Sequence, residues 1–236
     1  MLDDLDLSFD VGGIEIEDIN LNDFDLQIGY DEQTRYCKPK LYALKKSQIM
    51  YNNAMQLASD IDIRDNSRYD VVVSGNFIFG DYIEAFIKHW NVKCKRMTIS
   101  TLSMSQENID SLENLLRGGY VDELNVIVSA YFYSHELRSL IPYMYQHLDI
   151  DNRFQLSVAG LHTKTCQFET LGGRYVVIHG SANLRSSGNI EQFTIEENRE
   201  LYDFYDGMFS EIINRYKTIN KQIRGNDLWD VVNKRR

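Results

Sequence analysis

The sequence predicts an α/β protein whose mostly parallel or mixed sheet has helices on both faces, an α/β/α sandwich. Between residues 69 and 161, short segments rich in β-branched apolar residues alternate with segments of helical periodicity, a pattern typical of strands and helices in turn. The alternation stops after residue 161, where two arms around a pair of glycines predict a hairpin near residues 160–183. A length of 236 residues, 43% of them hydrophobic, suits a single core.

Each element follows from the spacing of its apolar residues. An amphipathic helix is expected over residues 41–60, where Leu and Ile recur at helical intervals. The next segments are, in chain order, a strand over 69–79, a helix over 81–90, a strand over 96–101, a helix from Ser105 to a stop at Gly118 and Gly119, a strand over 124–130, a helix over 134–148 and a strand over 154–161. After the hairpin, a long helix is expected over residues 196–217.

An acidic leader precedes this domain. The chain carries a formal charge of −10, from 35 acidic and 25 basic residues, but residues 1–32 hold eleven of the acids and no Lys or Arg. The leader alternates apolar and acidic residues, as in "DLDLSFDV", which is a strand-like pattern. We therefore divide the chain into a leader over 1–36 and a domain over 37–236. The leader is either a disordered solubilising tail or a segment that docks on a protein partner through residues 1–32.

Several classes of protein are disfavoured by the composition. Without the leader the chain is nearly neutral, with 24 acidic and 25 basic residues, so bulk positive charge is not its means of binding nucleic acid. No stretch reaches the roughly 18 apolar residues of a membrane span, and the N-terminus has no signal-peptide pattern. Three widely spaced cysteines form neither a disulfide framework nor a metal-ligand pattern, so we expect a cytoplasmic protein without a metal or cofactor.

The predicted hairpin concentrates the polar residues that can do chemistry. His162 and Lys164 occupy alternate positions of its first arm, which would point both side chains to one face of a strand. Ser181 and Asn183 end the returning arm, and Glu191 follows eight residues later. A nucleophile or acid–base group, a cation, two neutral donors and a carboxylate suit an anionic phosphoryl centre. The alternative is that His162 and Lys164 are ordinary solvent-facing residues of a hairpin.

With "HTK" at 162–164 and "GSAN" at 180–183, the sequence resembles the phospholipase D superfamily, whose signature is His-x-Lys, four residues, an Asp, and then Gly-Ser-x-Asn. The resemblance implies that His162 attacks phosphorus and forms a phosphohistidine. It also implies that Lys164 and Asn183 hold the non-bridging oxygens, with Ser181 assisting.

Two carboxylates are candidates for the acidic partner of His162. Glu169 stands where the signature has Asp, but ten residues separate it from Gly180, so its role as a possible acid is doubtful. Single-motif nucleases of this superfamily place a Glu downstream of the Asn, near the position of Glu191. We expect Glu191, rather than Glu169, to orient His162.

The superfamily's active site needs two motifs, and this chain carries one, which predicts a homodimer that joins two copies of His162. A short, single-motif chain resembles the nuclease branch, so the expected activity is metal-independent cleavage of DNA or RNA, with Arg185 as a phosphate contact. The aromatic residues 131–133 would either stack on a base or pack in the core. The alternatives are a non-catalytic component of a larger assembly and a phospholipid hydrolase or transferase.

Overall fold

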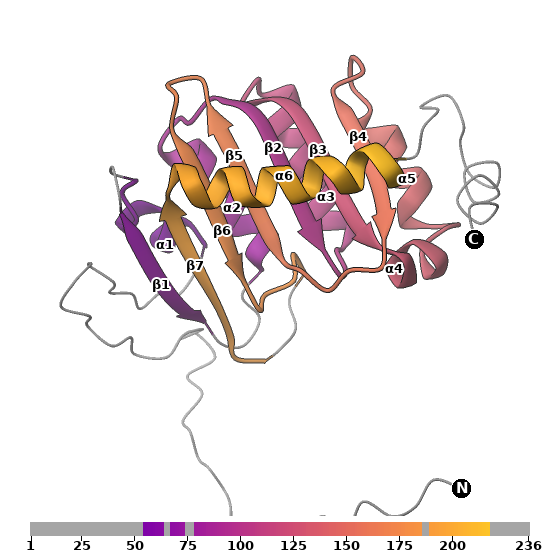
Figure 1. The fold of residues 1–236 in the computed structure, drawn as a ribbon, viewed down its shortest axis with the longest axis horizontal. Helices are drawn as coiled ribbons and strands as arrows, with labels where there is room; N and C mark the ends of the chain where they lie inside the picture. Colours follow the sequence, from indigo (N-terminus) through magenta and orange to yellow (C-terminus); the bar gives the residue numbers. More distant parts are fainter. Residues whose placement is uncertain (1–53, 64–66, 74–77, 186–188, 218–236) are drawn as a thin grey trace, which may run out of the picture. The chain divides into compact units, whose positions relative to one another are not determined.

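The computed structural model describes residues 54–63, 67–73, 78–185 and 189–217 (Figure 1). The acidic leader, the start of the helix predicted over 41–60 and the basic C-terminal residues lie outside the described residues. No helix within the described part of the chain is both long and apolar enough to cross a membrane.

A seven-stranded sheet forms the centre of the described domain, with the strand order β1-β7-β6-β5-β2-β3-β4. The strands are β1 (Arg68–Val73), β2 (Cys94–Thr101), β3 (Val121–Ser129), β4 (Phe154–Ala159), β5 (Thr165–Thr170), β6 (Tyr175–Gly180) and β7 (Glu191–Glu197). Neighbours run parallel between β2 and β3 and between β3 and β4, and all other neighbours are antiparallel. The predicted mixed α/β sheet is confirmed, and its parallel part is confined to β2, β3 and β4.

Helices cover both faces of the sheet, as predicted (Figure 1). The helices are α1 (Ala54–Asp60), α2 (Phe79–His89), α3 (Gln106–Arg117), α4 (Ala130–His135), α5 (Leu140–Leu148) and α6 (Arg199–Tyr216). In Figure 1, α6 crosses the front of the sheet and the other helices lie behind it. The main apolar core fills the space on the side of α2, α3 and α5.

The sheet face beneath α6 is unusually polar. In β2, Met97 and Ile99 belong to the apolar core, whereas Thr98 and Ser100 are buried on the opposite face. Arg96, on the same face as Thr98, forms an ion pair of 3.0 Å with Asp206 of α6. The helix is therefore held to the sheet through hydrogen-bonded and charged groups as well as through its own buried aromatic residues.

The predicted boundaries agree with the structure where a capping residue or a glycine ends an element. Ser105 is the N-cap of α3 and forms a capping box with Asn108, and the helix ends at Gly118. Gly119 has a φ of 64°, and Gly173, in the hairpin turn, has a φ of 78°. Both values lie in the left-handed region that glycine tolerates best, which explains why a helix stop and a turn occur there.

Two boundaries differ from the prediction. Phe79 begins α2 rather than ending β1, and the helix predicted over 134–148 is two helices, α4 and α5. Pro142 accounts for the break, since proline has no backbone N–H and is accommodated only in the first turn of a helix. A new helix must therefore begin shortly before Pro142, as α5 does at Leu140.

Strand β7 was not predicted. Residues from Glu196 onward were expected to begin the last helix, but Glu191–Glu197 is a strand inserted between β1 and β6. Phe193 and Ile195 are buried, and both alternate with polar residues, which was the available signal for a strand. The inserted strand places Glu191 in the sheet, at the start of β7.

Gly180 permits the close approach of β6 and β7. A Cβ atom added there would lie 2.1 Å from the Gln192 carbonyl oxygen and 2.6 Å from Phe193 Cα. Both are backbone atoms, so Gly180→Ala must push the strands apart, and we expect it to cost about 1–3 kcal/mol of unfolding free energy. Urea denaturation measures this cost.

The matched control is Gly207→Ala, in α6. A Cβ atom added at Gly207 meets no other atom within 4 Å. This substitution should stabilise the helix by about 0.5–1 kcal/mol, because alanine loses less conformational entropy on folding. Equal stability of Gly180→Ala and the unmodified protein would refute the close-approach explanation.

Candidate active site

Apart from Glu169, the candidate residues belong to segments that lie at one edge of the sheet. β5 is antiparallel to β2, so it begins near the edge where β2 ends, and β6 ends at that edge beside β5. The segment over 160–164 connects β4 to β5, and β2 and β3 lie between those strands in the sheet. The segment therefore passes along the edge where β2 and β3 end, as the trace at the lower edge of the sheet in Figure 1 shows.

His162 and Lys164 are in contact, although not by the geometry that the sequence predicted. Both precede β5, which begins at Thr165, so alternation along a strand does not align them. Instead Lys164 Nζ lies 3.0 Å from His162 Nδ1 and donates to the His162 carbonyl oxygen at 3.0 Å. Lys164 is only 9% exposed, whereas His162 is exposed. A buried cation thus lies against an imidazole that is exposed to solvent.

Burial lowers the pKa of Lys164, and the nearby negative charge of Glu191 partly opposes that effect. The ammonium is desolvated by the protein and faces a carboxylate. Such an ammonium gains more binding free energy than a solvated lysine when an anion binds beside it, because less water must be displaced.

The segment over 160–164, which holds His162 and Lys164, is anchored to the two strands that flank β5, namely β2 and β6. Thr163 Oγ1 and the buried hydroxyl of Ser100, in β2, are 3.0 Å apart. On the other side, the Gly180 N–H donates to the Lys164 carbonyl oxygen at 3.2 Å. These contacts hold the Thr163 side chain and the Lys164 backbone, directly after His162.

Ser181 and Glu191 are brought together by the pairing of β6 with β7. The Ser181 N–H donates to the Gln192 carbonyl oxygen at 2.8 Å, and the Gln192 N–H donates to Ser181 Oγ at 3.0 Å. Ser181 Oγ in turn donates a short hydrogen bond to a carboxylate oxygen of Glu191. The Ser181 hydroxyl is therefore oriented by both the backbone and the side chain of β7.

Asn183 and Arg185 complete the predicted set. Asn183 Oδ1 is buried and has no hydrogen-bond partner among the residues that the structure describes, and leaving a buried acceptor unpaired costs stability. The carbonyl oxygen of the intervening Leu184 accepts from the Gly80 N–H at 2.9 Å, which ties this segment to the start of α2. Arg185 is exposed.

Glu169 is not brought to this edge. It lies four residues after Thr165 in β5, which corresponds to about 13 Å along an extended strand. Its carboxylate accepts from Lys95 Nζ at 3.2 Å. Of the two candidate carboxylates, Glu191 is therefore the one that lies with Ser181 and Lys164.

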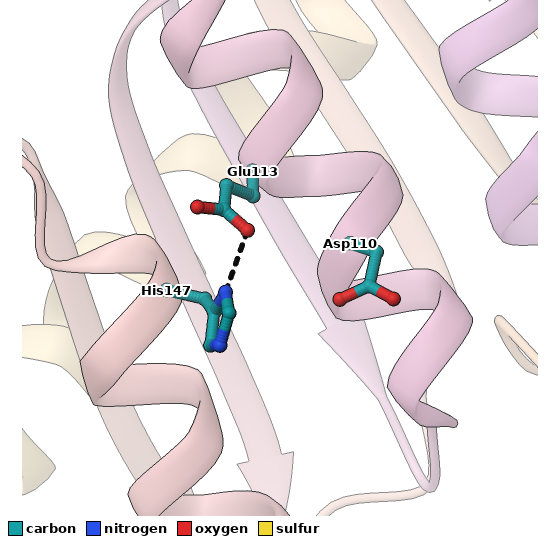
Figure 2. Close-up of side chains that lie close together, drawn as sticks. All are labelled: Asp110, Glu113 and His147. Carbon is teal, nitrogen blue, oxygen red and sulfur yellow. Dashed lines mark hydrogen bonds and ion pairs between the residues drawn. The ribbon is translucent and has the colours of Figure 1, made fainter.

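A second polar cluster, which the sequence analysis did not find, joins α3 to α5 (Figure 2). The ligand atoms of Asp110, Glu113 and His147 lie within 4.8 Å of one another, so these residues have the spacing to hold a metal ion. Each already has a protein partner: His147 Nδ1 is 2.6 Å from Glu113 Oε2, and Tyr143 Oη donates to Asp110 at 2.6 Å. These hydrogen bonds account for the cluster as a link between two helices.

Glu113 should make the protein sensitive to acid. Burial raises the pKa of Glu113, but the hydrogen bonds from His147 and Arg117 outweigh this effect and lower it. A lowered pKa in the folded state contributes stability above the unfolded pKa of about 4.3, and that stability is lost as the pH falls through the folded value. Glu113→Gln should therefore lower the urea midpoint at pH 7, and the difference should shrink as the pH approaches 3.5.

Glu211→Gln is the matched control. Glu211 pairs with Arg215 at the same i, i+4 spacing on α6, but its side chain is 61% exposed. An exposed pair contributes little, so the variant should unfold like the original protein at every pH. A pH-independent difference for Glu113→Gln would contradict the assignment.

Three solved structures are similar to this one. A phospholipase D family member, Nuc from Salmonella typhimurium, aligns at 14% identity and a TM-score of 0.47, over 64% of this chain and 97% of that one. NucT from Helicobacter pylori aligns at 13% identity and a TM-score of 0.44, over 63% of this chain and 97% of that one. Phosphatidylserine synthase from Haemophilus influenzae Rd KW20 aligns at 12% identity and a TM-score of 0.44, over 74% of this chain and 46% of that one.

No protein-family model and no curated protein sequence matches the chain. Identities of 12–14% and TM-scores below 0.5 do not decide an activity. The functional conclusion therefore depends on the residues of the site and their geometry.

Proposed function

We propose that this protein is a metal-independent phosphodiesterase of the phospholipase D type, and that it acts as a nuclease on DNA or RNA. The observation that carries the proposal is the contact between the exposed His162 and the buried Lys164, on the same sheet edge as Ser181, Asn183 and Glu191. Apart from Glu191, these residues belong to the His-x-Lys and Gly-Ser-x-Asn motifs, which are separated by 15 positions in sequence and joined here by the pairing of β5 with β6.

In the proposed reaction, a ring nitrogen of His162 attacks phosphorus and the bond to the leaving oxygen breaks, with a proton delivered to that oxygen. Water then attacks the phosphohistidine, which releases the phosphate monoester and restores the imidazole. Negative charge grows on the non-bridging oxygens, where Lys164 and Asn183 bind them and Ser181 assists. A phosphate oxygen is a stronger acceptor for the Lys164 ammonium than the ring nitrogen that it now contacts, so substrate binding would release His162 for attack.

The proposed role of Glu191 is to orient His162 while it holds Ser181. Its charge also opposes the lowering of the Lys164 pKa, so one carboxylate affects both the hydroxyl and the ammonium. The proposed role of Arg185 is a contact with a phosphate next to the one that is cleaved, because it is exposed and follows the motif by two residues.

The test of the chemistry is cleavage of DNA and RNA in EDTA. The unmodified protein should cleave, and His162→Ala should slow cleavage by about 10³-fold or more because no other nucleophile replaces the imidazole. A labelled phosphodiester should also leave an acid-labile phosphoryl group on His162 when the reaction is quenched. The rate of product formation and the mass of the trapped peptide are the measurements.

His89→Ala is the control for loss of an exposed histidine, because His89 ends α2. It should cleave at the original rate. Binding without cleavage of any nucleic acid would instead support a non-catalytic component of an assembly. Hydrolysis of phospholipid vesicles without cleavage of nucleic acid would support a lipid enzyme. Either result would overturn the nuclease proposal.

A homodimer is the proposed active form, because the leaving oxygen needs a proton and a second copy of His162 would supply it across a two-fold axis. Sedimentation velocity at micromolar concentration should show a dimer, and the specific activity should fall when dilution separates the subunits. A monomer that retains full specific activity at every concentration would refute this part of the proposal.

A further inference from the structure

We infer that Tyr131 and His135 form a stacking platform for an unpaired nucleobase of the substrate. This inference rests on the proposed function and deepens it, because it specifies a nucleic acid with an unpaired base beside the cleaved phosphodiester. The two rings lie one turn apart on α4, which follows β3 directly.

The platform is exposed, and contacts within α4 hold its two rings together. Tyr131 is 67% exposed, and its ring centroid lies 3.9 Å from that of His135, with 32° between the ring planes. His135 Nδ1 lies 2.8 Å from the Tyr131 carbonyl oxygen, which also accepts from Ser134 Oγ at 2.8 Å. A ring that already has a fixed neighbour loses little conformational entropy when a base stacks on it.

The adjacent aromatic residues show that Tyr131 is not a core residue. Phe132 is 4% exposed and Tyr133 is fully buried. They anchor α4 against the sheet, so the helix presents Tyr131 to solvent from a fixed base. The sequence analysis left stacking and core packing open for residues 131–133, and the structure assigns core packing to two of them and exposure to the third.

The platform and the segment over 160–164 are both attached to the end of β2. Ser129, the last residue of β3, donates to the Leu102 carbonyl oxygen just beyond β2, and it accepts from the Phe132 N–H in the first turn of α4. Two residues before Leu102, Ser100 contacts Thr163. Figure 1 shows α4 at the lower edge of the sheet, along which the segment between β4 and β5 also runs.

An unpaired base is the occupant that fits this surface. Every base has a flat π face that stacks on Tyr and His rings, whereas a base inside a duplex has both faces covered by its neighbours. Two exposed rings on a short helix offer little apolar area to an acyl chain, whose binding strength grows with the apolar surface that it buries. The location beside groups suited to a phosphodiester supplies the backbone contact that a stacked base needs.

The test is the binding of a fluorescein-labelled single-stranded oligonucleotide, measured by anisotropy in EDTA with the His162→Ala protein so that the probe stays intact. Adding Tyr131→Ala should weaken binding about five- to 150-fold, the range that a lost base–aromatic stack produces. Adding Tyr131→Trp should restore binding or tighten it. In the cleavage-competent protein, Tyr131→Ala should raise KM for the oligonucleotide more than it lowers kcat.

Phe204→Ala is the matched control, because Phe204 is also 67% exposed and lies on α6. It should bind the oligonucleotide as tightly as the His162→Ala parent. A blunt duplex of the same length should lose much less affinity on Tyr131→Ala than the single strand does.

The inference is overturned if Tyr131→Ala binds the single strand like its parent, if Phe204→Ala loses as much affinity, or if the parent does not bind the oligonucleotide. The binding experiment does not depend on turnover. Cleavage in EDTA with unchanged binding by Tyr131→Ala would therefore reject the platform and keep the nuclease. Conversely, if Tyr131→Ala weakens oligonucleotide binding but the unmodified protein never cleaves nucleic acid, the platform is kept and the nuclease is rejected.

Discussion

The close approach of β6 and β7 at Gly180 is the constraint on which the candidate site depends. No side chain fits between Gly180 and the Gln192 carbonyl oxygen, so the strands can pair up to the last residue of β6. This pairing aligns Ser181 with Gln192 and places the Ser181 hydroxyl on Glu191. The glycine of the Gly-Ser-x-Asn motif is therefore needed for strand packing, and the serine beside it owes its orientation to that packing.

The two faces of the sheet stabilise this edge through different interactions. One face carries the apolar core, which fixes the strands and the helices that start at the edge. The other face carries buried polar side chains such as Ser100, which contacts Thr163 in the segment over 160–164. A buried polar residue costs stability unless it is hydrogen-bonded, and the contact with Thr163 supplies that hydrogen bond while it fixes the segment to β2.

Much of the fold could be predicted from local signals. The capping box at Ser105 and the glycines after α3 fixed one helix, and the alternating arms around Gly173 fixed the hairpin. The division of the helix predicted over 134–148 into two helices could also have been predicted, because Pro142 cannot lie in a helix interior. Strand β7 was harder to predict, because its alternation of Phe193 and Ile195 with polar residues comes directly before helix α6.

The sequence by itself determined which chemical groups are present, because the His-x-Lys and Gly-Ser-x-Asn motifs can be recognised without a structure. The family resemblance already favoured Glu191 over Glu169, but only the tertiary structure gives the physical reason why Glu191 lies beside Ser181. Glu169 is nearer to Lys164 in the chain, but each residue of a strand adds about 3.3 Å and carries it to the other end of β5. Glu191 is 27 positions away from Lys164 in sequence, and strand pairing returns it to the site. Proximity along the chain and proximity in space differ wherever a strand runs away from the site.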